Sequence, residues 1–207
     1  EANARRILDR YRDEVCTFND DMQGTGAIAF AAILSGVRVT GRPLADHRVL
    51  VFGAGTAGVG IADQIRDAIV ESGYSQEEAC RRIWLIDRPG LLTDDMDDLR
   101  DYHRPYARPA AEVRDLERDP EGGISLLEAV RHVRPTILVG TSTVQGAFTE
   151  QVVREMHQHV QRPFILPMSN PTSLAEAVPA DLLHWTDGQA LIVTGSPFDS
   201  VKRGGVS

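Results

Sequence analysis

The stretch Arg48-Val-Leu-Val-Phe-Gly-Ala-Gly-Thr-Ala-Gly58 decides the fold. It starts with a short apolar run, which predicts a buried strand, and continues with the pattern G-x-G-x-x-G at the start of a predicted helix. In that setting Gly53 allows a tight turn, Gly55 admits a pyrophosphate close to the backbone, and Gly58 lets helix and strand pack closely. The helix N-terminus would then hold the phosphates of a dinucleotide. The predicted cofactor-binding residues of this loop are Gly53, Ala54, Gly55, Thr56, Ala57 and Gly58. A glycine-rich turn without a ligand is the alternative.

Four further apolar runs alternate with helical segments along the chain. They predict strands at 83–86, 136–139, 163–167 and 190–194. Strands that are apolar throughout and alternate with helices indicate a parallel sheet covered on both faces. We therefore predict the α/β class, with a doubly wound parallel sheet of Rossmann type and helices on both faces. The acidic, proline-containing segment 88–123 is predicted to be mostly loop and short helix.

The domain organisation follows from these elements. We expect a helical lead-in at 1–40, a dinucleotide-binding domain at 41–198 and a tail at 199–207. Within the lead-in, the segment 22–37 is rich in alanine and glycine and almost uncharged, which predicts a helix buried on all sides. The chain begins at Glu1 in what is predicted as a helix, so we expect it to be a piece of a longer protein.

Composition excludes several classes of partner. The formal net charge of −8 argues against non-specific binding to nucleic acid or anionic lipid. The apolar run 26–37 is too short to span a bilayer, so no membrane is expected. The chain has only two cysteines, Cys16 and Cys80, which favours a reduced, cytoplasmic setting. Five histidines are predicted to be solvated surface residues: His103, His132, His157, His159 and His184.

An acidic residue follows the second predicted strand. Asp87 stands where a carboxylate would accept hydrogen bonds from the adenosine ribose. A carboxylate there repels a 2′-phosphate and favours NAD, whereas the neighbouring Arg88 could neutralise that phosphate and admit NADP. We predict that both residues bind the cofactor, with NAD expected and NADP as the alternative.

The motif Asn19-Asp20-Asp21 stands before the predicted helix at 22–37. Asn19 or Asp20 would cap that helix, and acidic residues in its first turn are favoured by the helix dipole. Alternatively, the carboxylates contribute to a site for Mg²⁺ or Mn²⁺, which take oxygen ligands. Two carboxylates supply only part of an octahedral shell.

Several of these segments, in this order, resemble the malic enzyme family over nearly the whole chain. The stretch 91–109 is more similar to the bacterial NAD-linked branch than to the animal NADP-linked branch. The segments that carry the resemblance are Cys16-Thr-Phe-Asn-Asp-Asp-Met-Gln-Gly24-Thr25, Gly53–Gly58, Ile83-Trp-Leu-Ile-Asp-Arg-Pro-Gly-Leu-Leu92, Ser169-Asn-Pro-Thr-Ser173, Trp185-Thr-Asp-Gly188 and Thr194-Gly-Ser-Pro-Phe198.

The resemblance implies oxidative decarboxylation of malate to pyruvate and CO₂, with NAD(P)⁺ as hydride acceptor and Mg²⁺ or Mn²⁺ at the site. It implies that Asp21 is a metal ligand and that Asp20 is an adjacent acid that orients the site. Asn170 would contact nicotinamide or substrate, and Thr25 would contact the cofactor. Thr141 and Ser142 would line the cofactor cleft, because they follow a strand whose carboxyl end faces the ligand. Turn chemistry alone is the alternative for these polar loops.

The family's general acid tyrosine, its general base lysine and a Glu-Asp metal-binding pair are expected in a preceding domain that this chain does not contain. The resemblance therefore implies an isolated domain that binds NAD but is inactive by itself, taken from a homo-oligomeric enzyme. Two alternatives stay open. One is a domain of a malolactic enzyme, and the other is a non-catalytic NAD-binding module.

Overall fold

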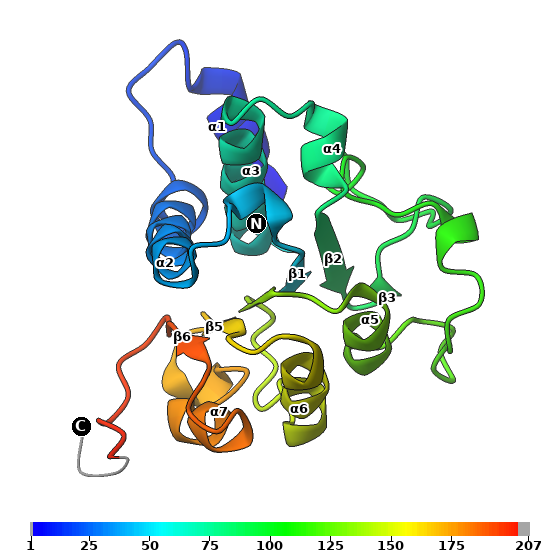
Figure 1. Ribbon diagram of the computed structural model, residues 1–207. Helices are drawn as coiled ribbons and strands as arrows, with labels where there is room; N and C mark the ends of the chain where they lie inside the picture. Colours follow the sequence, from blue (N-terminus) through cyan, green and yellow to red (C-terminus); the bar gives the residue numbers. More distant parts are fainter. Residues whose placement is uncertain (1, 203–207) are drawn as a thin grey trace.

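The computed structural model describes residues 2–202, so part of the tail predicted at 199–207 lies outside the described residues. Its centre is a six-stranded sheet in the order β3-β2-β1-β4-β5-β6 (Figure 1). The strand order runs in opposite directions on the two sides of the β1–β4 pair, which is the doubly wound arrangement. This confirms the predicted fold class. The strands are β1 (Val49–Phe52), β2 (Ile83–Asp87), β3 (Gly90–Leu91), β4 (Ile137–Gly140), β5 (Phe164–Pro167) and β6 (Leu191–Ile192).

Helices cover both faces of the sheet. In Figure 1, α1 to α4 lie on one side, and α5, α6 and α7 lie on the other. The helices are α1 (Ala2–Tyr11), α2 (Thr25–Thr40), α3 (Thr56–Glu71), α4 (Gln76–Cys80), α5 (Leu126–Val133), α6 (Glu150–His159) and α7 (Pro179–Trp185). A π-helical turn, η1 (Asp20–Gly24), precedes α2, and short 3₁₀ turns lie at η2 (Leu44–Asp46), η3 (Ala110–Glu112) and η4 (Thr172–Leu174).

The strands divide the apolar core into two layers because successive side chains point to opposite faces. In β1, Val49 and Val51 belong to the layer under α2 and α3, and Leu50 belongs to the layer under α5 and α6. All three are fully buried. The central strands are therefore held from both sides, and their carboxyl ends are fixed relative to one another.

One strand was not predicted. β3 lies in the segment expected to be loop and pairs antiparallel with the end of β2, through Ile86 with Leu91 and Asp87 with Gly90. Gly90 has a φ of +97°, and a Cβ there would lie 2.7 Å from the backbone nitrogen of Ile124. A strand of two residues has no periodicity to detect, so the sequence did not predict it. Its antiparallel pairing makes the sheet mixed at this edge, whereas we expected a strictly parallel sheet.

The helix expected at 22–37 differs from the prediction in its bounds and its burial. The helical run starts at Asp20 and ends at Thr40. One face of α2 packs on α3 and β5, but Ile28 is 66% exposed and Val39 is 58% exposed. The expectation of burial on all sides is wrong for this part of the chain, because a stripe of small residues suffices for the packing. That stripe consists of Gly26, Ala29 and Gly36, with Ile33.

This helical run has 21 residues and a mean hydropathy of 1.2. By length and composition alone it is enough to cross a membrane, a criterion that core helices of soluble proteins also meet. The absence of a membrane partner therefore stays a prediction.

The start of the chain is attached to α3. The Arg5 guanidinium pairs with Asp63 at 2.7 Å. A Cβ on Gly60 would lie 2.7 Å from the carbonyl oxygen of Met22, so η1 crosses α3 at a point where only glycine fits. The Asn19-Asp20-Asp21 motif thereby lies beside the helix that begins in the glycine loop.

Candidate functional site

The glycine loop has the geometry that its sequence predicts. Gly53 has a φ of +102°, and a Cβ there would lie 2.5 Å from the backbone nitrogen of Ser142. A Cβ on Gly58 would overlap the carbonyl oxygen of Gly53. Gly55 is the N-cap of α3 and has no side chain to cap it. The first turn of α3 therefore presents its N–H groups beside a loop that leaves room for an anion.

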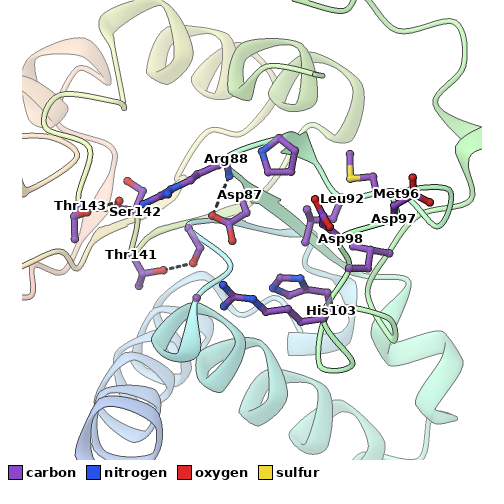
Figure 2. A pocket seen from close by; sticks show the side chains of 15 residues that line it. Asp87, Arg88, Leu92, Met96, Asp97, Asp98, His103, Thr141, Ser142 and Thr143 are labelled. Atoms are coloured by element: carbon purple, nitrogen blue, oxygen red, sulfur yellow. Dashed lines mark hydrogen bonds between the residues drawn. The ribbon is translucent and has the colours of Figure 1, made fainter. Parts of the chain in front are cut away.

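A cavity of about 820 Å³ opens at this loop (Figure 2). It lies at the carboxyl ends of β1, β2 and β4, where the strand order reverses and where ligands bind in open α/β sheets. Six of the predicted cofactor-binding residues line this cavity: Gly53, Gly55, Asp87, Arg88, Thr141 and Ser142. The fold thus brings together predicted residues from three separate loops, which follow β1, β2 and β4.

Asp87 is half-buried at the end of β2, and one of its carboxylate oxygens accepts a hydrogen bond from the backbone N–H of Arg88 at 2.9 Å. Arg88 is exposed, and its side chain extends toward Ser142 in Figure 2. The cavity mouth therefore carries a fixed carboxylate beside an exposed guanidinium. This geometry allows the two roles, ribose binding and phosphate neutralisation, that the sequence left open.

His103 is part of the cavity wall and is buried, so its prediction as a surface residue is wrong. Its Nε2 donates a hydrogen bond to the carbonyl oxygen of Ala54 at 2.7 Å, which ties the segment after β2 to the glycine loop. Burial lowers the pKa of this imidazole. His103 therefore supports the loop as a neutral side chain.

Thr141 and Ser142 line the cavity, but their hydroxyls are engaged within the protein. The Thr141 hydroxyl donates to the carbonyl oxygen of Gly53 at 2.6 Å. The backbone N–H and the hydroxyl of Ser142 both donate to the Glu176 carboxylate at 2.8 Å. These side chains shape the loop after β4, and both residues line the cavity together with Thr143.

The remaining predicted site residues lie away from this lining. Thr25 is the first residue of α2, and Asn170 is exposed after β5, where its side-chain oxygen accepts from the Ser196 hydroxyl. Asp20 and Asp21 are exposed at the start of η1. Their assigned contacts with nicotinamide, substrate or metal stay predictions.

The predicted role of Asn19 as a helix cap is confirmed. Its side chain accepts from the backbone N–H of Met22, and the Gln23 side chain accepts from the backbone N–H of Asn19, both at 3.0 Å. Asn19 caps the helix, so neither aspartate is needed for that purpose. Within residues 2–202, no group of three or more His, Cys, Asp or Glu side chains could hold a metal ion. The aspartate pair therefore fits a hard cation only as part of its shell.

Sequence reasoning missed one wall of the cavity. It consists of residues of the acidic segment 88–123, which we expected to be mostly loop and short helix: Leu92, Met96, Asp97, Asp98, Leu99 and Arg100, together with His103. The alternation of acidic residues with Leu92, Met96 and Leu99 was the available signal. A fully solvated loop has no need of buried apolar side chains, and Leu92 and Leu99 are buried.

Comparison with known proteins agrees with this geometry. The family described as malic enzyme, NAD binding domain, matches residues 22–207. The NAD-dependent malic enzyme 3 of Bacillus subtilis is 63% identical over 206 residues, which are 99% of this chain and 36% of that protein. A putative malate oxidoreductase [NAD] of Mycobacterium tuberculosis is 56% identical over 201 residues, or 97% of this chain and 36% of that protein.

Solved structures share the fold. The crystal structure of a malic enzyme from Entamoeba histolytica superimposes with a TM-score of 0.68 at 23% identity, covering 93% of this chain and 36% of that one. The NAD-dependent malic enzyme from Thermotoga maritima gives a TM-score of 0.65 at 24% identity, covering 93% and 45%. The chain spans about a third of the length of the curated relatives it matches. By its sequence and its fold, this chain belongs to the malic enzyme NAD-binding domain family.

Proposed function

We propose that the cavity beside the glycine loop binds NAD, with the pyrophosphate at the N-terminus of α3. The observation that carries this proposal is the backbone of the loop. Gly53 and Gly58 pass where no Cβ fits, and Gly55, the N-cap of α3, lines the cavity. Isothermal titration of the 207-residue chain with NAD tests it directly. An absence of heat at millimolar NAD would refute the proposal.

Asp87 supports NAD over NADP. Its carboxylate would accept hydrogen bonds from the ribose hydroxyls and would repel a 2′-phosphate. We expect Asp87→Asn to reduce the preference for NAD over NADP about tenfold, the effect of losing one hydrogen bond to a charged group. Asp101→Asn is the matched control, because Asp101 is an exposed residue outside the cavity lining. An unchanged preference in Asp87→Asn would refute the role of Asp87 in selecting NAD over NADP.

We further propose that a protein containing this domain oxidatively decarboxylates malate to pyruvate and CO₂. Relatives that share about half or more of its residues are named as NAD-dependent malic enzymes or malate oxidoreductases. In such a protein this chain would bind and orient the dinucleotide, while the general acid and base would come from another part. The isolated domain is then expected to bind NAD and to turn over no malate. Malate turnover by the isolated chain would contradict this division of roles.

The metal is proposed on the chemistry of its donors. Asp21, with Asp20 beside it, offers exposed hard oxygen ligands next to α3, and further ligands would have to come from outside the described residues 2–202. A bound Mg²⁺ or Mn²⁺ would polarise the substrate oxygens. Asn170 would contact nicotinamide or substrate from the loop after β5.

In a full-length protein that contains this domain, Asp21→Asn should abolish malate turnover and weaken Mn²⁺ binding, while NAD binding is kept. Asp13→Asn, at an exposed position before the motif, is the control. Full activity of Asp21→Asn would refute the metal role. Product analysis of the same protein separates pyruvate from the lactate of a malolactic enzyme, and light scattering tests the proposed homo-oligomer.

A further inference from the structure

Glu176 is a fully buried carboxylic acid that the proposed function does not use. It lies in the short connection between η4 and α7. An ionised carboxylate is costly to bury unless hydrogen bonds replace its lost hydration. The position of Glu176 therefore requires an explanation from its partners.

Those partners come from two loops. One carboxylate oxygen, Oε1, accepts from the backbone N–H of Ser142 and from its hydroxyl at 2.8 Å each, and from the Ser169 hydroxyl at 2.6 Å. The other oxygen, Oε2, accepts from the backbone N–H of Ser169 at 3.4 Å. Ser142 follows β4 and Ser169 follows β5. A single carboxylate thus joins the carboxyl ends of two neighbouring strands.

The surrounding backbone is built around this side chain. A Cβ on Gly140, the last residue of β4, would lie 2.5 Å from the Glu176 carboxyl carbon. The Ser169 hydroxyl also accepts from the backbone N–H of Thr143 at 2.9 Å, which links the two loops a second time. The carbonyl oxygen of Glu176 accepts from Phe148 at 2.9 Å. The shape of the loop from Ser142 to Phe148 therefore depends on Glu176.

These loops lie on one half of the cofactor crevice. Asp87 ends β2, on one side of β1, whereas β4 and β5 lie on the other side. In a doubly wound sheet a dinucleotide crosses this point, with adenosine on the side of β2. The loops after β4 and β5 then face the nicotinamide half.

We propose that Glu176 is a positioning residue that fixes the loops after β4 and β5 for the nicotinamide half of NAD. The proposal rests on the proposed NAD binding. Glu176 touches no cofactor, because it is fully buried and does not line the cavity. Its effect passes through Ser142, Thr143 and Ser169.

The test compares two ligands on the 207-residue chain. NAD uses both halves of the crevice, whereas AMP uses only the adenosine half. We expect Glu176→Gln to raise the Kd of NAD about tenfold and to leave the Kd of AMP within about a factor of two. An equal loss for both ligands, or no loss for either, would overturn the proposal. Failure of the unmodified chain to bind NAD would instead refute the proposed function.

Ser169→Ala provides a second test that does not alter the buried acid and applies even where Glu176→Gln fails to fold. Ser169 is buried and does not line the cavity, so its loss acts only through the network. We expect the same separation of NAD from AMP, and no further loss when it is combined with Glu176→Gln. Independent, additive losses would overturn the proposal. Glu150→Gln, an exposed glutamate paired with Arg154, is the control that keeps both affinities.

Discussion

His47 is predicted to make the stability of this domain depend on pH. It lies just before β1, where its Nδ1 is 2.9 Å from the Thr136 hydroxyl and its ring is 5.2 Å from that of Phe164. The Nε2 atom is buried and has no hydrogen-bond partner. Burial, reinforced by the positive charge of Arg42, lowers the pKa of His47 from 6.5 to about 4. The folded protein therefore holds this imidazole neutral.

The sign and size of the effect follow from linkage. A histidine with a lowered pKa in the folded state binds a proton more readily when the chain is unfolded, so its stabilising contribution is present above pH 6.5 and is lost as the pH falls toward 4. The full difference corresponds to about 3 kcal/mol at about 1.4 kcal/mol for each pKa unit. At about pH 5 the loss is about 2 kcal/mol. Asp46 and Arg48 also face this ring, with opposite effects on its pKa.

The assay is urea unfolding, followed by circular dichroism, at about pH 7.5 and about pH 5 for the unmodified chain and for His47→Gln. Other titrating groups are common to both proteins, so they cancel in the difference between the two pH dependences. We expect His47→Gln to lose about 2 kcal/mol less than the unmodified chain on acidification. His184→Gln, at an exposed histidine, is expected to follow the unmodified chain. Identical pH dependences for the unmodified chain and His47→Gln would refute the reasoning.

Three further substitutions test other parts of the fold by the same unfolding assay. Gly58→Ala should cost about 2 kcal/mol or more and weaken NAD binding, because the new methyl group overlaps the Gly53 carbonyl; unchanged stability would mean that the loop can move apart. Tyr106→Phe should cost about 1 to 2 kcal/mol, because its hydroxyl donates to Asp63 at 2.7 Å inside the core, and a neutral result would show that the arginines around Asp63 compensate. Ser125→Ala should cost about 1 kcal/mol through loss of the α5 N-cap, with Ser35→Ala as the exposed control; an equal effect of the two would refute the capping role.

The parts of the site that the sequence predicts correctly are local. The positive φ of Gly53, the start of α3 and the approach of Gly58 to the Gly53 carbonyl involve residues within 48–58, and the glycine pattern predicts them. Asp87 is predicted well for a related reason, since it follows a recognisable strand whose neighbour in the sheet is β1. Topology then places it beside the loop.

The errors concern contacts between distant segments. His103 was expected in solvent, but its partner, Ala54, lies on a loop 49 positions away. The helix at α2 was expected to be buried on all sides, but Ile28 and Val39 are exposed, because composition shows how apolar a helix is and not how many neighbours it has. β3 has only two residues, so its pairing depends on the course of the chain after Asp87 rather than on any pattern within it.

The loop after β4 shows why a residue can be placed correctly while its role is not predicted. The general rule for parallel sheets places Thr141 and Ser142 at the ligand edge, and both line the cavity. Their hydroxyls nevertheless point to Gly53 and Glu176, because a tight loop over a buried carboxylate must satisfy that carboxylate first. Conservative changes at Ser142 should therefore act on the shape of the cleft before they act on any direct contact with NAD. The shape of this edge of the sheet therefore depends on Glu176, which is buried and does not line the cavity.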